Sequence, residues 1–403
     1  MTTSLVSREL SPDAEAILLL SASLGKRTRG AESPLTPREY DALADSLRHA
    51  DLRPHNVLFA DTSVLIDLTE HLPPAVRKHV TPERLRGLRQ RGGQLALALS
   101  KWSGQGIWVI TRADAGYPSR YKQKLGRSAP PVVFGIGDRS LLEHGGIAVV
   151  GSRNPDPASE AFTRHIATWA ADAGVQVVSG AARGVDEIAM VTCAAQGGTA
   201  LGVVGESLLR LSIRREFREQ ILRNRLTLIS SYDPEAPFTA ANAMGRNRWV
   251  YALAERCVVV ACSEGRGGTW AGAVEALKNG VPVFVKTGNP DRPGNEALLH
   301  YGAQPVPDDL SELLRTVSAK NTPAVKVDHA VFTAVLPFIL HSLREPVTVK
   351  ELAVRLDLTQ AQLKRWLGRM VAEGTVVKQG SHFSAASSKV SSDTRQISLL
   401  SIK

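Results

Sequence analysis

The chain has 403 residues, and its 49 lysines and arginines exceed its 39 aspartates and glutamates to give a formal charge of +10. This length allows two or three domains, and the basic excess favours a polyanionic partner. No run of 18 apolar residues occurs and the first ten residues lack an apolar core, so we expect neither a membrane span nor a signal peptide. Cys193, Cys257 and Cys262 lie in apolar surroundings without metal-ligand spacing, so we expect no metal site, buried thiols and a cytoplasmic location.

Residues 1–105 are predicted to form an N-terminal helical domain of the SAM or helix-hairpin type. Pro37 opens one amphipathic segment, PREYDALADSLRHA, and Pro82 opens another, PERLRGLRQRGGQLALALSKW. Proline is favoured in the first turn of a helix, and leucine and alanine recur at helical spacing in both segments. No convincing strand occurs in this region.

Residues 106–316 are predicted to form a Rossmann-like, doubly wound α/β domain with a mostly parallel sheet. Short apolar runs alternate with helical stretches, and continuous apolar strands separated by helices indicate a parallel sheet covered on both faces. The runs are IAVVG, VQVVSG, TALGVVG, LTLISS, CVVVAC and VPVFVKTG. The preceding segment, from IWVITR to FGIGD, is expected to add one strand and a bridging turn.

The C-terminal part is predicted to contain a small separate domain. Residues 317–328 have few large apolar residues and are interpreted as a linker. Residues 329–384 suggest three helices and a hairpin that turns near Gly380, which is winged-helix patterning. The serine-rich residues 385–403 are predicted to be disordered.

Four strand-to-helix junctions of the α/β domain share an unusual composition. In a doubly wound sheet, ligands bind where strand ends meet helix N-termini, whose free N–H groups attract anions. Each junction carries a close-approach glycine, a hydroxyl or an arginine, and the strand after the last one ends in a lysine. The candidate phosphate-binding residues are Gly151, Ser152, Arg153, Ser179, Gly180, Arg183, Gly184, Arg246, Asn247, Arg248, Gly267, Gly268, Thr269 and Lys286.

Each junction taken alone also fits an ordinary turn with a solvated arginine. Together they are expected to place Arg153, Arg183, Arg246 and Arg248 along one sheet edge. A row of arginines without a pair of catalytic acids is more typical of a surface that binds successive phosphates than of an active site. Neither G-x-S-x-G nor H-E-x-x-H occurs, so we expect a binding protein without a cofactor rather than an enzyme.

Six motifs, in this order, resemble the DNA-processing protein A family, also called DprA or Smf. They are YPSRYKQKL, PPVVFGIGD, AVVGSR, VVSGAARGVDEIA, GRNRWVYALAERCVVV and NEALLHYGAQPV, and the resemblance spans Trp108 to Val306. It implies a Rossmann-like fold that binds single-stranded DNA, usually as a homodimer. It further implies that the protein protects incoming strands and loads RecA recombinase in DNA uptake or recombination.

The chain departs from the family pattern at several of these positions and is therefore similar to a divergent member. Met190 stands where the family usually has a histidine, and Gly272 stands where it usually has a threonine. A strand that usually ends in Val-Pro-Gly ends here in Val285, Lys286, Thr287 and Gly288.

Two alternatives stay open at this point. Lys364, Arg365 and Arg369 on the third C-terminal helix are candidates for contact with DNA or with a protein partner. The departures from the family pattern also allow a nucleotide sensor of phage defence, and the glycine-rich loop suggests a phosphoribohydrolase-like enzyme, whose motif is PGGxGTxxE. In GRGGTWAGAVE, however, Glu275 lies six residues past Thr269 rather than three.

Overall fold

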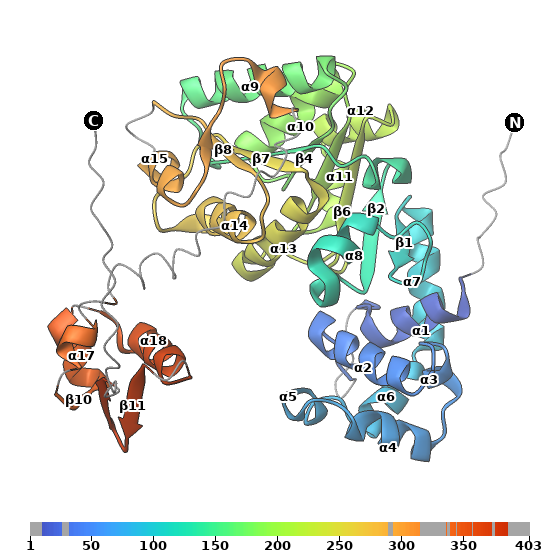
Figure 1. The fold of residues 1–403 in the computed structure, drawn as a ribbon. Helices are drawn as coiled ribbons and strands as arrows, with labels where there is room; N and C mark the ends of the chain where they lie inside the picture. Colours follow the sequence, from blue (N-terminus) through green and yellow to red (C-terminus); the bar gives the residue numbers. More distant parts are fainter. Residues whose placement is uncertain are drawn as a thin grey trace, which may run out of the picture. The chain divides into compact units, whose positions relative to one another are not determined.

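The computed structural model describes residues 10–25, 32–288, 293–314, 336, 339–343, 345–356, 358–372 and 375–385. The chain divides into two compact units, Met1–Thr316 and Val317–Lys403. The predicted linker 317–328 lies outside the described residues, as does most of the predicted tail 385–403. Figure 1 shows the ribbon of both units, which are treated separately below.

The first unit begins with short helices that are packed together. Leucines from most of these helices form one core with the near end of the sheet, including Leu18, Leu43, Leu65 and Leu85. The helices are α1 (Pro12–Ser21), α2 (Pro37–His49), α3 (Asn56–Phe59), α4 (Thr62–Glu70), α5 (Pro74–Arg77), α6 (Pro82–Arg89) and α7 (Gly92–Gly104).

The segment that begins at Pro82 is two helices rather than one. Helix α6 ends at Arg89 and helix α7 begins at Gly92. Two consecutive glycines, Gly92 and Gly93, weaken helix propensity at this point. The intervening Arg91 donates from its guanidinium to the carbonyl of Ala22, which fixes the break against helix α1.

The sheet of the first unit has nine strands in the order β1-β2-β6-β5-β4-β3-β7-β8-β9. The six expected strands pair in parallel and occupy the middle, which confirms a large, mostly parallel sheet. The strands are β1 (Trp108–Thr111), β2 (Val132–Ile136), β3 (Ile147–Val150), β4 (Val177–Ser179), β5 (Ala200–Val203), β6 (Leu226–Ser230), β7 (Arg256–Val259), β8 (Val283–Val285) and β9 (Gln304–Pro305).

The edge that precedes the parallel strands holds two strands instead of the single expected one. Strands β1 and β2 pair with each other, and β2 pairs with β6, all antiparallel. The expected bridging turn is helix α8 (Ser119–Leu125) with the 3-10 helix η1 (Gly126–Ser128). The apolar run Val132–Phe134 is fully buried, which explains why it joins the sheet rather than a turn.

Helices cover both faces of the sheet (Figure 1). Alternate residues of one strand enter different cores, since Ile147 and Val149 pack in one cluster and Ala148 and Val150 in the other. The first face is covered by α9 (Pro157–Asp172), α10 (Val185–Ala195), α11 (Leu208–Ser212) and α12 (Arg215–Leu222). The second is covered by α8, α13 (Ala240–Leu253), α14 (Gly267–Lys278) and α15 (Pro293–His300).

The sequence places Arg246 and Arg248 at the start of one helix and Thr269 at the start of another, but both helices begin earlier. Helix α13 begins at Ala240 because Thr239 caps it, with its Oγ1 accepting the N–H of Asn242 at 3.0 Å. Arg246 and Arg248 therefore lie near the middle of this helix and not at its start. Helix α14 begins at Gly267 rather than Thr269.

The chain reverses its direction of winding at strand β3. Strands β4, β5 and β6 follow on one side of β3, whereas β7, β8 and β9 follow on the other. The loops after β3 and β7 therefore diverge and leave a crevice at the carboxyl ends of the strands, where open α/β sheets bind ligands.

The second unit contains a small antiparallel sheet and two described helices. The strands β10 (Val347–Thr348), β11 (Val376–Gln379) and β12 (His382–Ala385) lie in the order β10-β12-β11. The helices are α17 (Val349–Leu356) and α18 (Gln360–Ala372). Gly380, with φ +61°, lies in the turn between β11 and β12 where the sequence predicts one. Within the described residues of both units, no helix has the length and apolar character of a membrane span.

Candidate functional site

Two adjoining cavities open at the crevice beside β3, with volumes of about 420 and 460 Å³. They share five lining residues, which are Arg153, Ala182, Phe238, Ala243 and Arg246. Their walls come from the loops after β3, β4, β5 and β7 and from the start of helix α13. We call this continuous surface the sheet-edge groove.

The loop after β3 is shaped by a tight turn and a helix cap. Ser152 Oγ accepts the N–H of Asn154 at 3.1 Å and donates to its carbonyl at 3.0 Å. Asp156 then caps helix α9 by accepting the N–H of Ser159 at 2.8 Å. These local bonds hold Arg153 at the apex of the loop, exposed to solvent.

A buried ion pair lies beneath the groove. Nη2 of Arg246 lies 3.5 Å from Oδ2 of Asp186, and each side chain is only 8% exposed. The Asp186 carboxylate also accepts the backbone N–H groups of Gly151 and Ala182. Burial raises the pKa of Asp186, and the guanidinium and these two amides act in the opposite direction. An internal carboxylate therefore occupies the amides that a phosphate at this turn would use.

Glycines let these loops approach one another closely. A Cβ on Gly180 would lie 1.4 Å from Nη1 of Arg246, so only glycine fits over the guanidinium. Gly184, with φ +90°, brings its backbone against the loop after β3, where a Cβ would lie 2.4 Å from the carbonyl oxygen of Ser152. Ala181 adopts φ +54°, which costs about 1 kcal/mol in a residue other than glycine. The surrounding packing must hold this loop in place.

Four exposed arginines and one phenylalanine line the groove. Arg153 stacks over the ring of Phe238, with Cζ 5.0 Å from the centroid, and this phenylalanine is 45% exposed. Arg183 donates to the side-chain carbonyl of Asn154. The remaining two are Arg210, which forms an ion pair with Glu206 at 3.3 Å, and Arg266 beside the glycine-rich loop. The groove therefore offers guanidinium groups and a half-exposed aromatic ring together.

The third and fourth junctions join the groove through hydrogen bonds between loops. Asn247 Nδ2 donates to the carbonyl of Gly268 at 2.9 Å, and Thr269 Oγ1 donates to the carbonyl of Gly151 at 3.1 Å. Both polar side chains are thus engaged in holding the loop after β7 against its neighbours. Gly267 and Gly268 line the same cavity.

Several predicted site residues lie elsewhere. Ser179 is fully buried and donates to the carbonyl of Val149 at 2.6 Å. Lys286 lies over the ring of Phe162, 5.7 Å from its centroid, and lines neither cavity. Arg248 lines two other cavities, on the far side of helix α13.

The winged-helix candidates are only partly described. Lys364 is exposed on helix α18, whereas the side chains of Arg365 and Arg369 lie outside the described residues. Leu363, Trp366, Leu367 and Met370 on the same helix form the core of the second unit. Contact of this helix with DNA or a protein partner stays a prediction.

Sequence reasoning missed Phe238, Arg210 and Arg266. Phe238 stands directly before the cap of helix α13, in a proline-containing loop that carries no motif. Arg210 lies on the short helix α11 after β5, outside the four junctions that the sequence singles out. Arg266 lies within the glycine-rich segment, where an arginine beside three glycines is the signal that could have found it.

The acidic residues near the groove are not arranged for catalysis. Within the described lining, the carboxylates are Asp186, which is buried in its ion pair, and Glu206, which pairs with Arg210. Glu275 lines a different cavity, between helices α8, α13 and α14. No group of three or more potential metal-ligating side chains occurs among the described residues.

Comparison with known proteins places this arrangement in a family. A sequence model of the DNA recombination-mediator protein A family matches residues 108–317, which is more than half of the chain. The chain belongs to this family. The matched region contains all nine strands of the sheet and the whole sheet-edge groove.

Individual relatives agree with this assignment. The DNA processing protein DprA of Bacillus subtilis is 27% identical over 219 residues, which cover 53% of this chain and 72% of that protein. Protein Smf of Escherichia coli is 31% identical over 193 residues, 46% of this chain and 51% of that protein. The chain thus spans about half the length of the second relative.

A solved structure shares the fold. The X-ray structure of DNA processing protein A from Streptococcus pneumoniae superposes with a TM-score of 0.57 and 20% identity. The match covers 70% of this chain and 93% of the other. At this level of identity the likeness concerns the fold alone.

Proposed function

We propose that the sheet-edge groove binds single-stranded DNA. One observation carries the proposal, namely that the exposed guanidinium of Arg153 lies over the half-exposed ring of Phe238 inside a groove lined by three more exposed arginines. Arginines neutralise backbone phosphates, and an open aromatic face stacks a base that is not already paired. The names of the relatives, DNA processing protein and recombination mediator, support a nucleic-acid ligand and a DNA-processing role.

The same geometry favours a ligand with several backbone phosphates rather than a single nucleotide. Asp186 already occupies the amides of Gly151 and Ala182, which favours phosphates held by arginine side chains over a pyrophosphate at the turn. Glu275, which the phosphoribohydrolase alternative requires beside the glycine-rich loop, lines another cavity. We therefore propose a binding function without catalysis.

Binding of a fluorescent oligonucleotide at several salt concentrations tests the function. Arg153→Ala with Arg183→Ala removes two exposed cations of the groove. If each contacts one phosphate, the slope of log K against log salt falls by about 1.4, since a single strand contributes about 0.7 for each contact. The intact protein must bind in a salt-sensitive way.

A matched control removes the same charge elsewhere. Arg86→Ala with Arg215→Ala neutralises two arginines that pair with Glu83 and Glu219 within their own helices and line neither cavity of the groove. This control should leave the slope unchanged. Absence of binding by the intact protein, or an equal effect of both double variants, contradicts the proposal.

Absence of catalysis is tested separately. Incubation with nucleoside monophosphates should release no free base. Release of base that Glu275→Gln abolishes would establish the enzymatic alternative instead.

We further propose that the protein acts as a mediator that protects the bound strand and delivers it to RecA recombinase, as a homodimer. The family description, recombination mediator, supports this role. Faster RecA assembly on a coated single strand in the presence of the protein is the expected result. Light scattering should give twice the mass of 43.4 kDa.

A further inference from the structure

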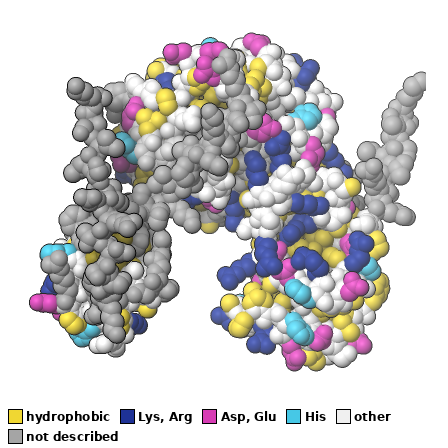
Figure 2. All heavy atoms as spheres, viewed as in Figure 1, with side chains coloured by type: hydrophobic (Ala, Val, Ile, Leu, Met, Phe, Trp, Pro, Cys, Tyr) yellow, Lys and Arg dark blue, Asp and Glu magenta, His cyan; other side chains and the backbone are white. Residues whose placement is uncertain are grey.

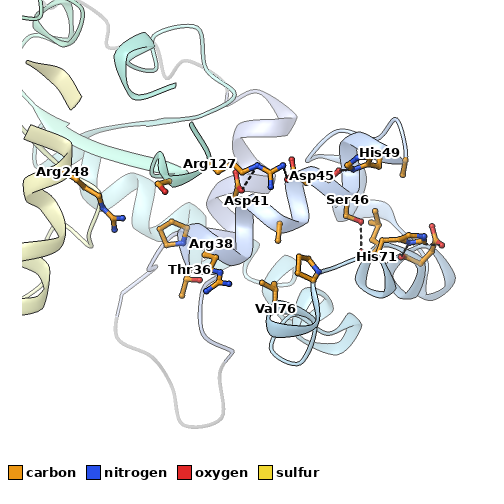
Figure 3. Close-up of a pocket in the computed structure, with 17 residues that line it drawn as sticks. Thr36, Arg38, Asp41, Asp45, Ser46, His49, His71, Val76, Arg127 and Arg248 are labelled. Atoms are coloured by element: carbon orange, nitrogen blue, oxygen red, sulfur yellow. Dashed lines mark hydrogen bonds and ion pairs between the residues drawn. The ribbon is translucent and has the colours of Figure 1, made fainter. Parts of the chain in front are cut away.

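A large cavity of the first unit lies away from the sheet-edge groove. It has a volume of about 1170 Å³ and is lined by residues of helices α2, α4 and α5, of η1 and by Arg248 of helix α13. Figure 3 shows Arg248 entering from helix α13, whereas Arg38, Asp41 and Asp45 come from helix α2. This cavity, which we call the leader cavity, has no part in the function proposed above.

Helix geometry explains why Arg248 reaches the leader cavity. Successive residues of an α-helix are rotated by about 100°, so residues two apart point in nearly opposite directions. Arg246 is buried beneath the groove, and Arg248 therefore projects from the other side of the same helix. Asn247 between them holds the glycine-rich loop. Helix α13 is thus a wall shared by the groove and the leader cavity.

Two acidic side chains of the leader cavity, Asp41 and Asp45, form ion pairs with arginines, of which only Arg127 lines the cavity itself. Asp41 forms ion pairs with Arg112 at 3.3 Å and with Arg127 at 4.0 Å. Asp45 forms ion pairs with Arg48 at 2.6 Å and with Arg127. Three arginines thus share two carboxylates, and the network retains one positive charge.

Two further cations of the cavity have no carboxylate partner among the described residues. Arg38 is exposed on helix α2. Arg248 donates to the carbonyl of Gly245 in its own helix, and its Cζ lies 5.9 Å from the ring of Trp249. The remaining acid, Asp67, lies 3.7 Å from Nδ1 of His71 and is 66% exposed. The lining itself holds three arginines and three aspartates, and the surplus of positive charge comes from Arg48 and Arg112, which pair with two of these aspartates from outside the lining.

We propose that the leader cavity binds phosphates of the same DNA strand after it has passed the sheet-edge groove. The inference rests on the proposed function, because the strand must first occupy the groove. Helix α13 supplies the continuity, since it lines both sites. Figure 2 shows dark-blue lysine and arginine side chains gathered over the junction between the α8 region and the N-terminal helices. The guanidinium groups of Arg38 and Arg248, which have no carboxylate partner among the described residues, match a phosphate backbone.

Oligonucleotide length separates the two sites. A strand of about 6 nucleotides fills only the groove, whereas one of about 20 nucleotides reaches beyond it, on the scale of known single-strand sites. Arg38→Ala with Arg248→Ala should lower the salt slope by about 1.4 for the long strand and leave the short strand unchanged. Arg153→Ala with Arg183→Ala should weaken binding of both lengths.

Two controls exclude general effects. Arg38→Lys with Arg248→Lys retains both charges and should restore most of the slope for the long strand. Arg86→Ala with Arg215→Ala changes the net charge by the same amount and should have no effect on either length.

Every outcome bears on the inference. If the intact protein binds both lengths but Arg38→Ala with Arg248→Ala affects neither or both equally, the inference is wrong and the proposed function stands. If the intact protein binds neither length, both fall. If a fluorescent polyglutamate peptide binds and only this double variant loses it, while DNA binding is unchanged, the cavity serves an acidic protein partner instead.

Discussion

A methyl group on Gly180 tests whether the buried ion pair holds the groove together. Its Cβ would lie 1.4 Å from Nη1 and 1.9 Å from Cζ of Arg246. Non-bonded heavy atoms need about 3.5 Å, so the guanidinium must retreat by about 2 Å. Asp186 Oδ2 is already 3.5 Å from Nη2 of Arg246, and this retreat therefore breaks the ion pair.

The structure sets the size of the effect. Breaking a buried ion pair costs about 3–5 kcal/mol, because one charge is left without a partner in the interior. The urea slope of a unit this large is about 2–3 kcal/mol per molar, so the unfolding midpoint of Gly180→Ala should fall by about 1–2.5 M. Circular dichroism follows the transition, and DNA binding should weaken in parallel because the loops above the pair lose their support.

A double-mutant cycle shows whether the methyl group acts through Arg246. In an Arg246→Ala background, Gly180→Ala should add little further cost, since the clash is gone. Gly93→Ala is the control, because a Cβ there meets nothing within 4 Å in an exposed helical turn and should be neutral or slightly stabilising. If Gly180→Ala unfolds within about 1 kcal/mol of the intact protein, our account of the pair is wrong.

Three further predictions concern the cap, the acid stability and the aromatic face. Asp156→Ala removes the cap of helix α9 and should lower the free energy of unfolding by about 1 kcal/mol in urea titration, whereas Asp156→Asn, which can still accept the N–H of Ser159, should lose less. Burial would raise the pKa of Asp13, but hydrogen bonds from His55 and an arginine outweigh it and leave this pKa below 3.8. The stability that this carboxylate contributes is therefore present above pH 3.8 and is lost as the pH falls further. Asp13→Asn should remove this dependence of stability on acid. Phe238→Ala should weaken single-strand binding by about 1–3 kcal/mol in a fluorescence titration, whereas Phe238→Trp should not; equal affinity of Phe238→Ala and the intact protein contradicts stacking.

The parallel part of the fold could be predicted from the sequence because its strands are short, continuous apolar runs. Strands Ile147–Val150 and Val177–Ser179 are buried along their whole length, and polar residues do not alternate with apolar ones along them. Strand β2 could not be predicted in the same way, because PPVVFGIGD begins with two prolines and contains two glycines, which are turn signals. The pairing of Phe134 with Ser230 across the sheet overrides that local preference.

The sequence predicts which loops form the candidate site, but it does not predict how their side chains are arranged in space. The motifs identify Arg153 and Arg183, which line the groove, because glycine and arginine after a buried strand are a local signal. They do not separate Arg246 from Arg248, because that requires knowing that helix α13 begins at Ala240 and turns the two side chains apart. Burial of Arg246 depends on its pairing with Asp186, a residue distant in the sequence, which no spacing rule contains.

The hydrogen bonds between the loops of the groove bear on how fast a ligand binds. Asp186 holds the loops after β3 and β4, and Thr269 ties the loop after β7 to Gly151. A site whose loops are already held needs little ordering on association and has no slow closing step. Association with a single strand should therefore follow one exponential phase, with a rate proportional to DNA concentration and reduced by salt through electrostatic steering.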